Sequence, residues 1–117
     1  MKTSELTGAA LDWAVAKCEG ATEEWRSDAP FLWHGVPCIR MDGHDVNYRP
    51  SSYWVLGGPI IERERLDLWW CEGNKFYTAS KSGGKDVEDG PTPLIAAMRC
   101  YVASKLGDEV EIPQELT

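Results

Sequence analysis

The clearest helix in the chain is predicted by residues 92–107, whose sequence is TPLIAAMRCYVASKLG. Thr92 suits the N-cap, proline suits the first helical position, and Gly107 is a typical stop signal, so we expect a helix that ends at about Leu106. Apolar residues recur along it at helical spacing, which predicts a buried stripe of Ile95, Met98, Val102 and Leu106, widened by Leu94 and Tyr101.

A second helix is predicted from Gly8 to about Glu19, with an N-cap at Thr7 and a stop at Gly20. One face of this segment carries apolar side chains at helical spacing, namely those of Leu11, Ala14, Val15 and Cys18. Such a one-sided helix buries its apolar face on a neighbouring element, so we expect it to cover a sheet.

Strand signals lie between the two helices. The first group comprises a short strand at Val36 and residues 39–41, a turn at residues 42–45, and an extended segment at residues 46–54 that Pro50 interrupts. The second comprises a hairpin of Leu66–Cys71 and Phe76–Ala79 around a turn, followed by a loop at residues 80–89. Together these signals predict an α+β fold: a small antiparallel sheet with two main helices packed on one face and long loops.

Length and composition predict one globular domain over residues 1–117, because 43% of the residues are hydrophobic and 26% are charged. We expect a cytoplasmic protein, since no apolar region follows the start as in a signal peptide and no apolar run approaches the about 20 residues of a membrane span. The net charge of −7 and the absence of a Lys/Arg run argue against DNA binding. Six Trp residues are hard to bury in so short a chain, so some are expected at a groove or interface.

Motifs for catalysis, cofactors and metals are missing. The chain has no GxGxxG, P-loop, HExxH or GxSxG pattern, so we predict no catalytic residue and no cofactor. The four Cys residues are scattered without a CxxC pair, which predicts free thiols packed as small apolar groups. A zinc site of Cys38, His34 and His44 is conceivable, but the usual ligand spacing is absent and we predict no metal.

The first candidate for anion binding is Gly57-Gly58-Pro59, where we expect a helix to start with Gly58 as the cap. A helix start exposes free N–H groups and carries about half a positive charge, and glycines let a ligand approach closely. Trp54 before it can stack on a base, and Arg63 one turn later can bind phosphate. The alternative, which composition alone favours, is that the glycines only turn the chain and residues 62–65 pair with one another.

The second candidate is the start of the last helix, where Thr92 and nearby backbone amides lie at the positive end and Arg99 follows about two turns later. The alternative, again favoured by composition, is a well-capped helix with a surface arginine.

Two long blocks, residues 48–64 and 90–110, and a shorter one near the start resemble the NinX-type accessory proteins of tailed phages, a family of unknown function. Trp54, Gly57, Gly58, Pro59 and Arg63 match the family pattern, along with Glu62. Tyr53 and Leu56 stand where the family usually has Asp and Gln, and residues 21–47 match poorly. The resemblance implies a single NinX-like domain and a nonessential phage product that acts on host machinery or host defence, with no known reaction.

Three hypotheses follow for the function. The first is a non-enzymatic binding protein that sequesters a small anionic nucleotide signal of host defence at a homo-oligomer interface, through Tyr48, Trp54, Gly57, Gly58, Pro59, Arg63, Thr92 and Arg99. It predicts that Arg63→Ala abolishes ligand retention with little change in melting temperature.

The second hypothesis is an acidic, Trp-rich inhibitor of a host enzyme, acting by DNA mimicry. The third is a nucleotide hydrolase with a metal on Glu62, Glu64 and Asp67, although Glu62 and Glu64 would point apart on a helix.

Overall fold

The structure is a computed structural model that describes residues 1–81, 84 and 86–116. Within them lie the helices α1 (Gly8–Cys18), α2 (Trp54–Glu64) and α3 (Pro93–Leu106). The strands are β1 (Phe31–Trp33), β2 (Val36–Met41), β3 (His44–Asn47), β4 (Leu66–Cys71), β5 (Phe76–Lys81) and β6 (Val87–Gly90). Two short 3-10 turns, η1 (Thr3–Glu5) and η2 (Gln114–Leu116), lie near the chain ends.

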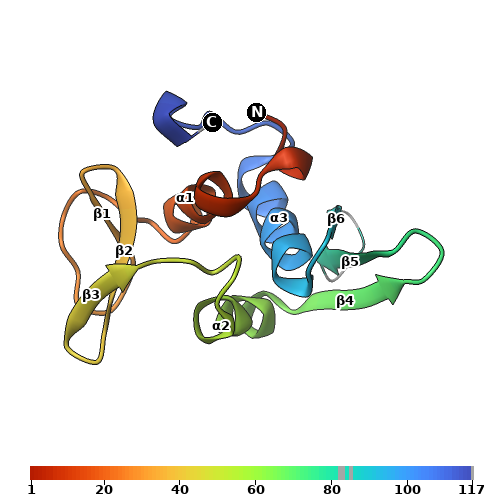
Figure 1. Ribbon diagram of the computed structural model, residues 1–117, viewed down its shortest axis with the longest axis horizontal. Coiled ribbons are helices and arrows are strands. Elements are labelled where there is room, and N and C mark those ends of the chain that lie inside the picture. The colour runs from red at the N-terminus through yellow and green to blue at the C-terminus, as the bar shows by residue number, and fades with distance from the viewer. Residues whose placement is uncertain (82–83, 85, 117) are drawn as a thin grey trace.

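The strands form two antiparallel sheets, β1-β2-β3 and β4-β5-β6, each with three strands. Figure 1 shows the two sheets at opposite ends of the long axis, with the three helices between them. The molecule measures 42 × 30 × 23 Å. The α+β class is therefore confirmed, whereas the expectation of a single sheet is wrong. Because α2 separates the two groups of strands in the chain, each group pairs within itself, and in the described residues no strand pairing joins the two sheets.

Helix α3 is the central element, and its predicted bounds and caps are confirmed. The Thr92 hydroxyl accepts a hydrogen bond of 3.1 Å from the amide of Ile95, and the helix ends at Gly107. Its buried surface is broader than the predicted stripe and includes Ala96, Ala97, Cys100 and Ala103, whereas Leu106 is 43% exposed. The reason is that α1 packs on one side of α3 and strands β5 and β6 on the other, so small residues are needed on both.

Helix α1 follows its N-cap Thr7, as predicted, although the Thr7 side chain makes no capping hydrogen bond. Leu11, Ala14 and Val15 are completely buried. The helix packs mainly against α3 and more lightly against β2, so it covers another helix rather than a sheet.

Helix α2 differs most from the sequence-based expectation. It begins at Trp54 after Tyr53, so the predicted start at Pro59 is wrong and Gly57-Gly58-Pro59 lie inside the helix. The amide of Gly57 donates to the carbonyl of Tyr53 at 3.0 Å, which is a helical hydrogen bond. Pro59 has no N–H and therefore cannot donate a hydrogen bond within the helix. Burial of Leu56 and Ile60 on one face of the helix stabilises it nevertheless.

The strand predictions are confirmed in part. The hairpin of β4 and β5 has the expected turn, with Cys71 opposite Phe76, but β5 continues to Lys81. Strand β6 at Val87–Gly90 occupies part of the predicted loop at residues 80–89, because it pairs with β5 and packs under α3. Residues 82–83 and 85 of that loop lie outside the described residues.

Candidate functional site

The described part of the chain contains a cavity of about 420 Å³ beside the starts of α1 and α3, which we call the helix-start pocket. It lies between the helices and the β1–β3 sheet. Its volume falls within the range of about 300–1,000 Å³ that is typical of small-molecule sites. The pocket is lined by Thr7, Gly8, Ala9, Asp12, Val36, Pro37, Asn47, Tyr48, Arg49, Ser51, Ser52, Ile95 and Leu116.

A smaller cavity of about 290 Å³ adjoins the helix-start pocket and shares Ser51, Ser52 and Ile95 with it. It is further lined by Trp54, the first residue of α2, and by Thr92 and residues 93–94 at the start of α3. The starts of all three α-helices of the described residues therefore border this pair of cavities. The starts of α1 and α2 have no side-chain cap on their N–H groups, and all three helix starts carry the positive end of a helix dipole, so their convergence favours an anionic group.

Arg49 adds a full positive charge to the wall of the helix-start pocket. Its side chain is exposed, and within the described residues no hydrogen bond or ion pair engages the guanidinium. A free guanidinium is suited to bind phosphate with two parallel hydrogen bonds. The pocket thus has a cation whose hydrogen-bond donors are unused within the described residues.

Asp12 adds a negative charge to the same wall. Its side chain is 7% exposed, and its Oδ1 accepts a hydrogen bond of 2.9 Å from the amide of Ser51. Burial raises the pKa of Asp12, while the amide and hydroxyl of Ser51 and the charge of Arg49 act in the opposite direction. The two charged residues therefore make the pocket electrostatically asymmetric.

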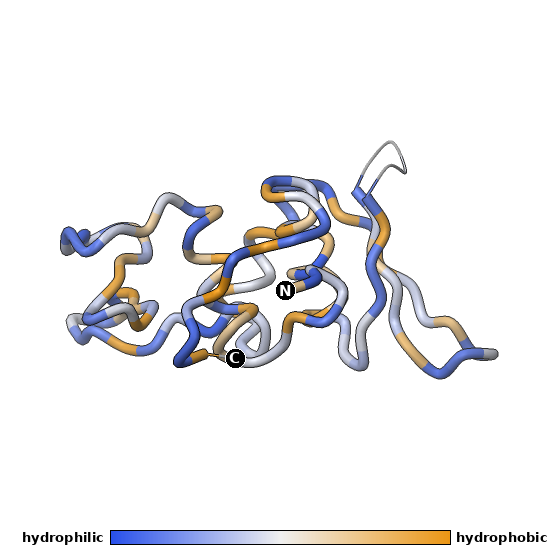
Figure 2. Tube along the Cα trace, turned by 90° about the horizontal axis from the view of Figure 1, so that it is seen from above, coloured by the Kyte–Doolittle hydropathy of each residue, from blue (hydrophilic) through white to orange (hydrophobic). Residues whose placement is uncertain are grey.

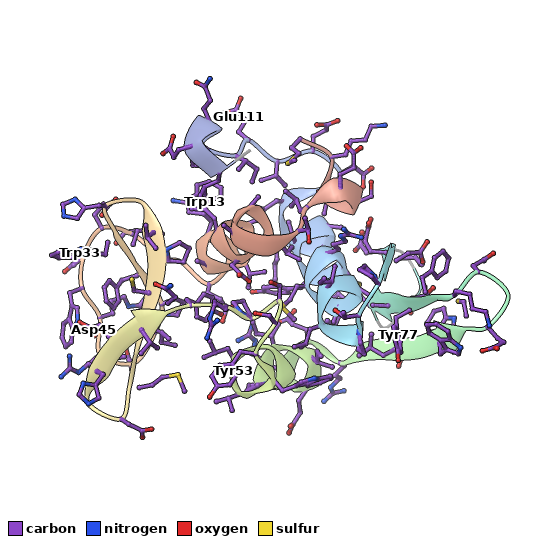
Figure 3. The ribbon with its side chains drawn as sticks, in the orientation of Figure 1. Trp13, Trp33, Asp45, Tyr53, Tyr77 and Glu111 are labelled. Carbon is purple, nitrogen blue, oxygen red and sulfur yellow. The ribbon has the colours of Figure 1, made fainter. Side chains whose placement is uncertain are left out.

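Three of the eight predicted site residues lie around these cavities. Tyr48 lines the helix-start pocket, where it is 4% exposed, and Trp54 and Thr92 line the smaller cavity. Trp54 is 54% exposed, so its ring is accessible to a planar group. Figure 3 shows the neighbouring Tyr53 at the start of α2.

Gly57, Gly58 and Pro59 line neither cavity. A Cβ on Gly57 would meet the carbonyl oxygen of Pro50 and, at 2.6 Å, Cδ2 of Leu94. Gly57 is therefore needed for close packing of α2 rather than for the approach of a ligand.

Arg63 lies near the other end of α2, in an ion-pair network. Its Nη1 and Nη2 donate to the two carboxylate oxygens of Glu19 at 3.0 and 2.7 Å, and its Nε donates to Glu64 at 3.0 Å. The hydroxyl of Tyr101 also donates to Glu19. These hydrogen bonds raise the pKa of Arg63 above its usual value and join α1, α2 and α3.

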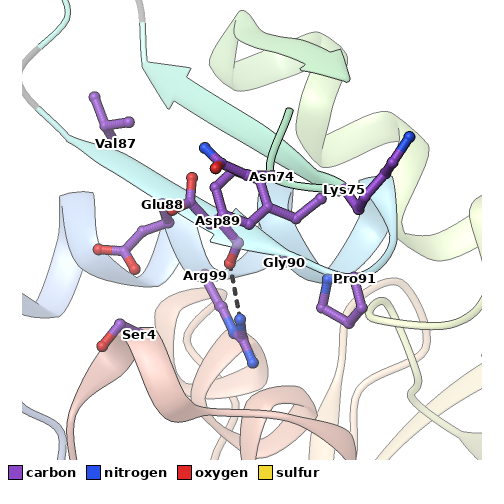
Figure 4. A pocket seen from close by; sticks show the side chains of 10 residues that line it. Ser4, Asn74, Lys75, Val87, Glu88, Asp89, Gly90, Pro91 and Arg99 are labelled. Carbon is purple, nitrogen blue, oxygen red and sulfur yellow. Dashed lines mark hydrogen bonds between the residues drawn. The ribbon is translucent and has the colours of Figure 1, made fainter. Parts of the chain in front are cut away.

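Arg99 lines a third, separate cavity of about 550 Å³ (Figure 4). Its Nε donates to the carbonyl of Leu6 at 2.7 Å, and its Nη1 donates to the carbonyl of Asp89 at 2.8 Å. Glu88 and Asp89 line the same cavity, so its charge is mixed. These two hydrogen bonds of Arg99 connect the segment before α1 to the end of β6.

Four residues that line the pocket were not predicted from the sequence, namely Asp12, Arg49, Ser51 and Ser52. Arg49-Pro50-Ser51-Ser52 lies inside the first family-like block, so a signal was present. The helix start predicted at Pro59 placed the candidate anion site at Gly57-Gly58-Pro59 instead, whereas α2 begins at Trp54.

A metal site is not assembled by the described residues, among which no group of three or more His, Cys, Asp or Glu side chains comes together. Of the carboxylates considered for a hydrolase, Glu64 is engaged by Arg63 and by Lys81, whose Nζ donates to it at 2.9 Å. None of the helices in the described residues is long and apolar enough to span a membrane.

Exposed tryptophans lie at both ends of the molecule, which confirms that some rings remain outside the core. Trp33 on β1 is 64% exposed and Trp25 is 52% exposed, while Trp69 and Trp70 on β4 are 46% and 44% exposed. Figure 3 shows Trp33 at the outer side of the first sheet, and Figure 2 shows hydrophobic residues in both sheets.

Comparison with known families gives the context of this pocket. The family model described as Bacteriophage P22, NinX matches residues 2–105, which is most of the chain. The chain belongs to the NinX family. No curated protein is significantly similar to this NinX-family chain. Membership of this family supports the interpretation of the chain as a phage accessory protein. All residues that line the helix-start pocket except Leu116 lie within the matched residues.

Proposed function

We propose that this NinX-family protein binds and sequesters a small anionic nucleotide in the helix-start pocket. The observation that carries the proposal is the exposed guanidinium of Arg49, which makes no hydrogen bond or ion pair within the described residues and lines a cavity bordered by helix starts. A fold that leaves a cation free beside several helix starts offers a ready site for phosphate.

The aromatic residues support a nucleotide over a bare anion. Tyr48 lines the pocket, and the exposed ring of Trp54 borders the adjoining cavity, so a planar base has apolar surface to contact. Phosphate would lie near Arg49 and the helix starts, because charge attraction is strongest there.

Sequestration rather than turnover is the role that we propose, with the ligand a nucleotide signal of host defence. A phage accessory protein can lower the free concentration of such a signal when it is made in excess and binds tightly. We further propose that the binding species is a homo-oligomer, since a second copy would close the open side of the pocket.

Native mass spectrometry and calorimetry with cyclic and linear nucleotides test the proposal. We expect uptake of a discrete ligand that is released unchanged on denaturation, and a loss of affinity of about tenfold or more in Arg49→Ala. Arg26→Ala is the matched control, because Arg26 is exposed and lines none of the cavities described above. A ligand recovered as product would instead identify a hydrolase, and equal affinities of both variants would contradict the assigned pocket.

The second candidate function is inhibition of a host enzyme by a protein–protein contact. It is favoured by the exposed Trp25 and Trp33 and by the net charge of −7, which suits a basic partner. A complex captured from host lysate and eluted by salt would support it if Trp33→Ala abolished capture while Arg49→Ala did not.

A further inference from the structure

Asp12 lines the helix-start pocket, and its negative charge does not contribute to phosphate binding. Its side chain is more than nine-tenths buried, and the rest of the lining is largely apolar or backbone, with Val36, Pro37 and Ile95 among its residues. A carboxylate at such a site repels phosphate and is costly to bury. Ser51 and the charge of Arg49 offset part of this cost.

The known contacts of Asp12 fill only part of its capacity. An ionised carboxylate accepts about four hydrogen bonds and donates none. The single residue that engages it by hydrogen bonds in the described part of the chain is Ser51, whose amide donates to Oδ1 at 2.9 Å. Asp12 lines the cavity and retains acceptor capacity, which a ligand with N–H or O–H donors can use.

We propose that Asp12 recognises a guanine base, whose Watson–Crick edge presents the N1–H and the N2 amino group side by side. This inference rests on the proposed nucleotide binding and specifies its ligand. Adenine and cytosine place a ring-nitrogen acceptor beside their amino donor, and uracil flanks its one N–H with two carbonyls. An acceptor-only carboxylate therefore matches guanine best among the common bases.

The two charged residues also set the direction of the ligand. Phosphate is attracted to Arg49 and repelled by Asp12, while the donor edge of guanine is attracted to Asp12. A guanine nucleotide bound with its base at Asp12 and its phosphate toward Arg49 satisfies both groups of the same cavity.

Calorimetry with GMP, IMP and AMP tests the assignment. IMP differs from GMP only by the missing N2 amino group, so we expect GMP to bind about tenfold or more tightly than IMP and AMP. In Asp12→Asn the amide oxygen still accepts from Ser51, but the new amide NH₂ opposes the guanine donors, so the preference for GMP over IMP should vanish. Asp28→Asn is the control, because Asp28 is exposed and lies outside the cavities described above.

The outcomes separate this inference from the proposed function. Binding of all three nucleotides with equal affinity would overturn the role of Asp12 and leave nucleotide binding intact. A preference for GMP that persists in Asp12→Asn would likewise overturn it. No uptake of GMP would overturn the guanine assignment, and no uptake of any member of the cyclic and linear nucleotide panel would overturn the proposed function as well. If Asp12→Asn fails to fold, the ranking of GMP, IMP and AMP by the unaltered protein still decides.

Discussion

Arg63 donates two hydrogen bonds to the carboxylate of Glu19, from Nη1 to Oε1 at 3.0 Å and from Nη2 to Oε2 at 2.7 Å. Arg63 lies in the last turn of α2, and Glu19 is the C-cap of α1. The pair therefore joins two helix ends that are 44 residues apart in the chain. The Arg63 side chain is 49% exposed, whereas the Glu19 side chain is only 16% exposed. Removing the arginine would therefore leave a mostly buried carboxylate without its main partner.

Arg63→Ala is expected to lower the free energy of unfolding by about 1–2 kcal/mol, because Glu19 and Glu64 both lose a charged hydrogen bond. The sequence alone predicted little change in melting temperature for this variant, together with loss of ligand. Thermal unfolding of Arg63→Ala beside Arg26→Ala decides between the two expectations. An unchanged melting temperature would show that the network contributes nothing to stability.

Glu64→Gln tests how the same network depends on pH. Burial opposes ionisation of Glu64, but hydrogen bonds from Lys81 and Arg63 outweigh it and hold the pKa below its usual value of 4.5. The stabilising effect of the charged form is thus complete above pH 4.5 and is lost as the pH falls through the lower folded-state pKa. Melting temperatures from pH 7 downward should differ most between the variant and the unaltered protein at neutral pH and converge in acid.

Gly57→Ala and Gly58→Ala are a matched pair in one helix. The new methyl group at residue 57 would collide with Pro50 and Leu94, so we expect a loss of about 1–3 kcal/mol of stability. At residue 58 the nearest atom is Cε3 of Trp54 at 3.6 Å, so the methyl fits and the higher helix propensity of alanine should add about 0.5–1 kcal/mol. Chemical denaturation measures both. Equal effects of the two changes would contradict the packing of α2 described above.

The thiols of Cys18 and Cys100 are expected to resist alkylation in the folded protein. Burial, with help from Glu19, raises the pKa of Cys18 to about 12, and burial, with help from Asp86 and Glu88, raises that of Cys100 to about 11. At pH 8 both should therefore react more than about tenfold more slowly than in the urea-unfolded chain. Residue-resolved mass spectrometry after brief iodoacetamide treatment measures this, and rapid labelling of Cys100 would reveal frequent opening of the core.

Much of the fold could be predicted because its signals are local. Thr92, Pro93 and Gly107 bound α3 by capping chemistry that acts within one turn, and the β4–β5 hairpin follows from strand propensity around a short turn. The start of α2 could not be predicted in this way. Pro59 is typical of a first helical position, but burial of Leu56 and Ile60 outweighs the hydrogen bond that the proline lacks.

The sequence by itself determined the α+β class, two of the three helices, the free thiols and the membership of the NinX family, since these depend on local spacing or on long matching blocks. Only the tertiary structure decided which charged side chains are free. Arg63 and Arg99 are engaged by Glu19 and by backbone carbonyls, whereas Arg49 borders a cavity with Asp12. The physical reason is that these partners lie up to 93 residues apart in the chain, and no local pattern encodes which of them meet.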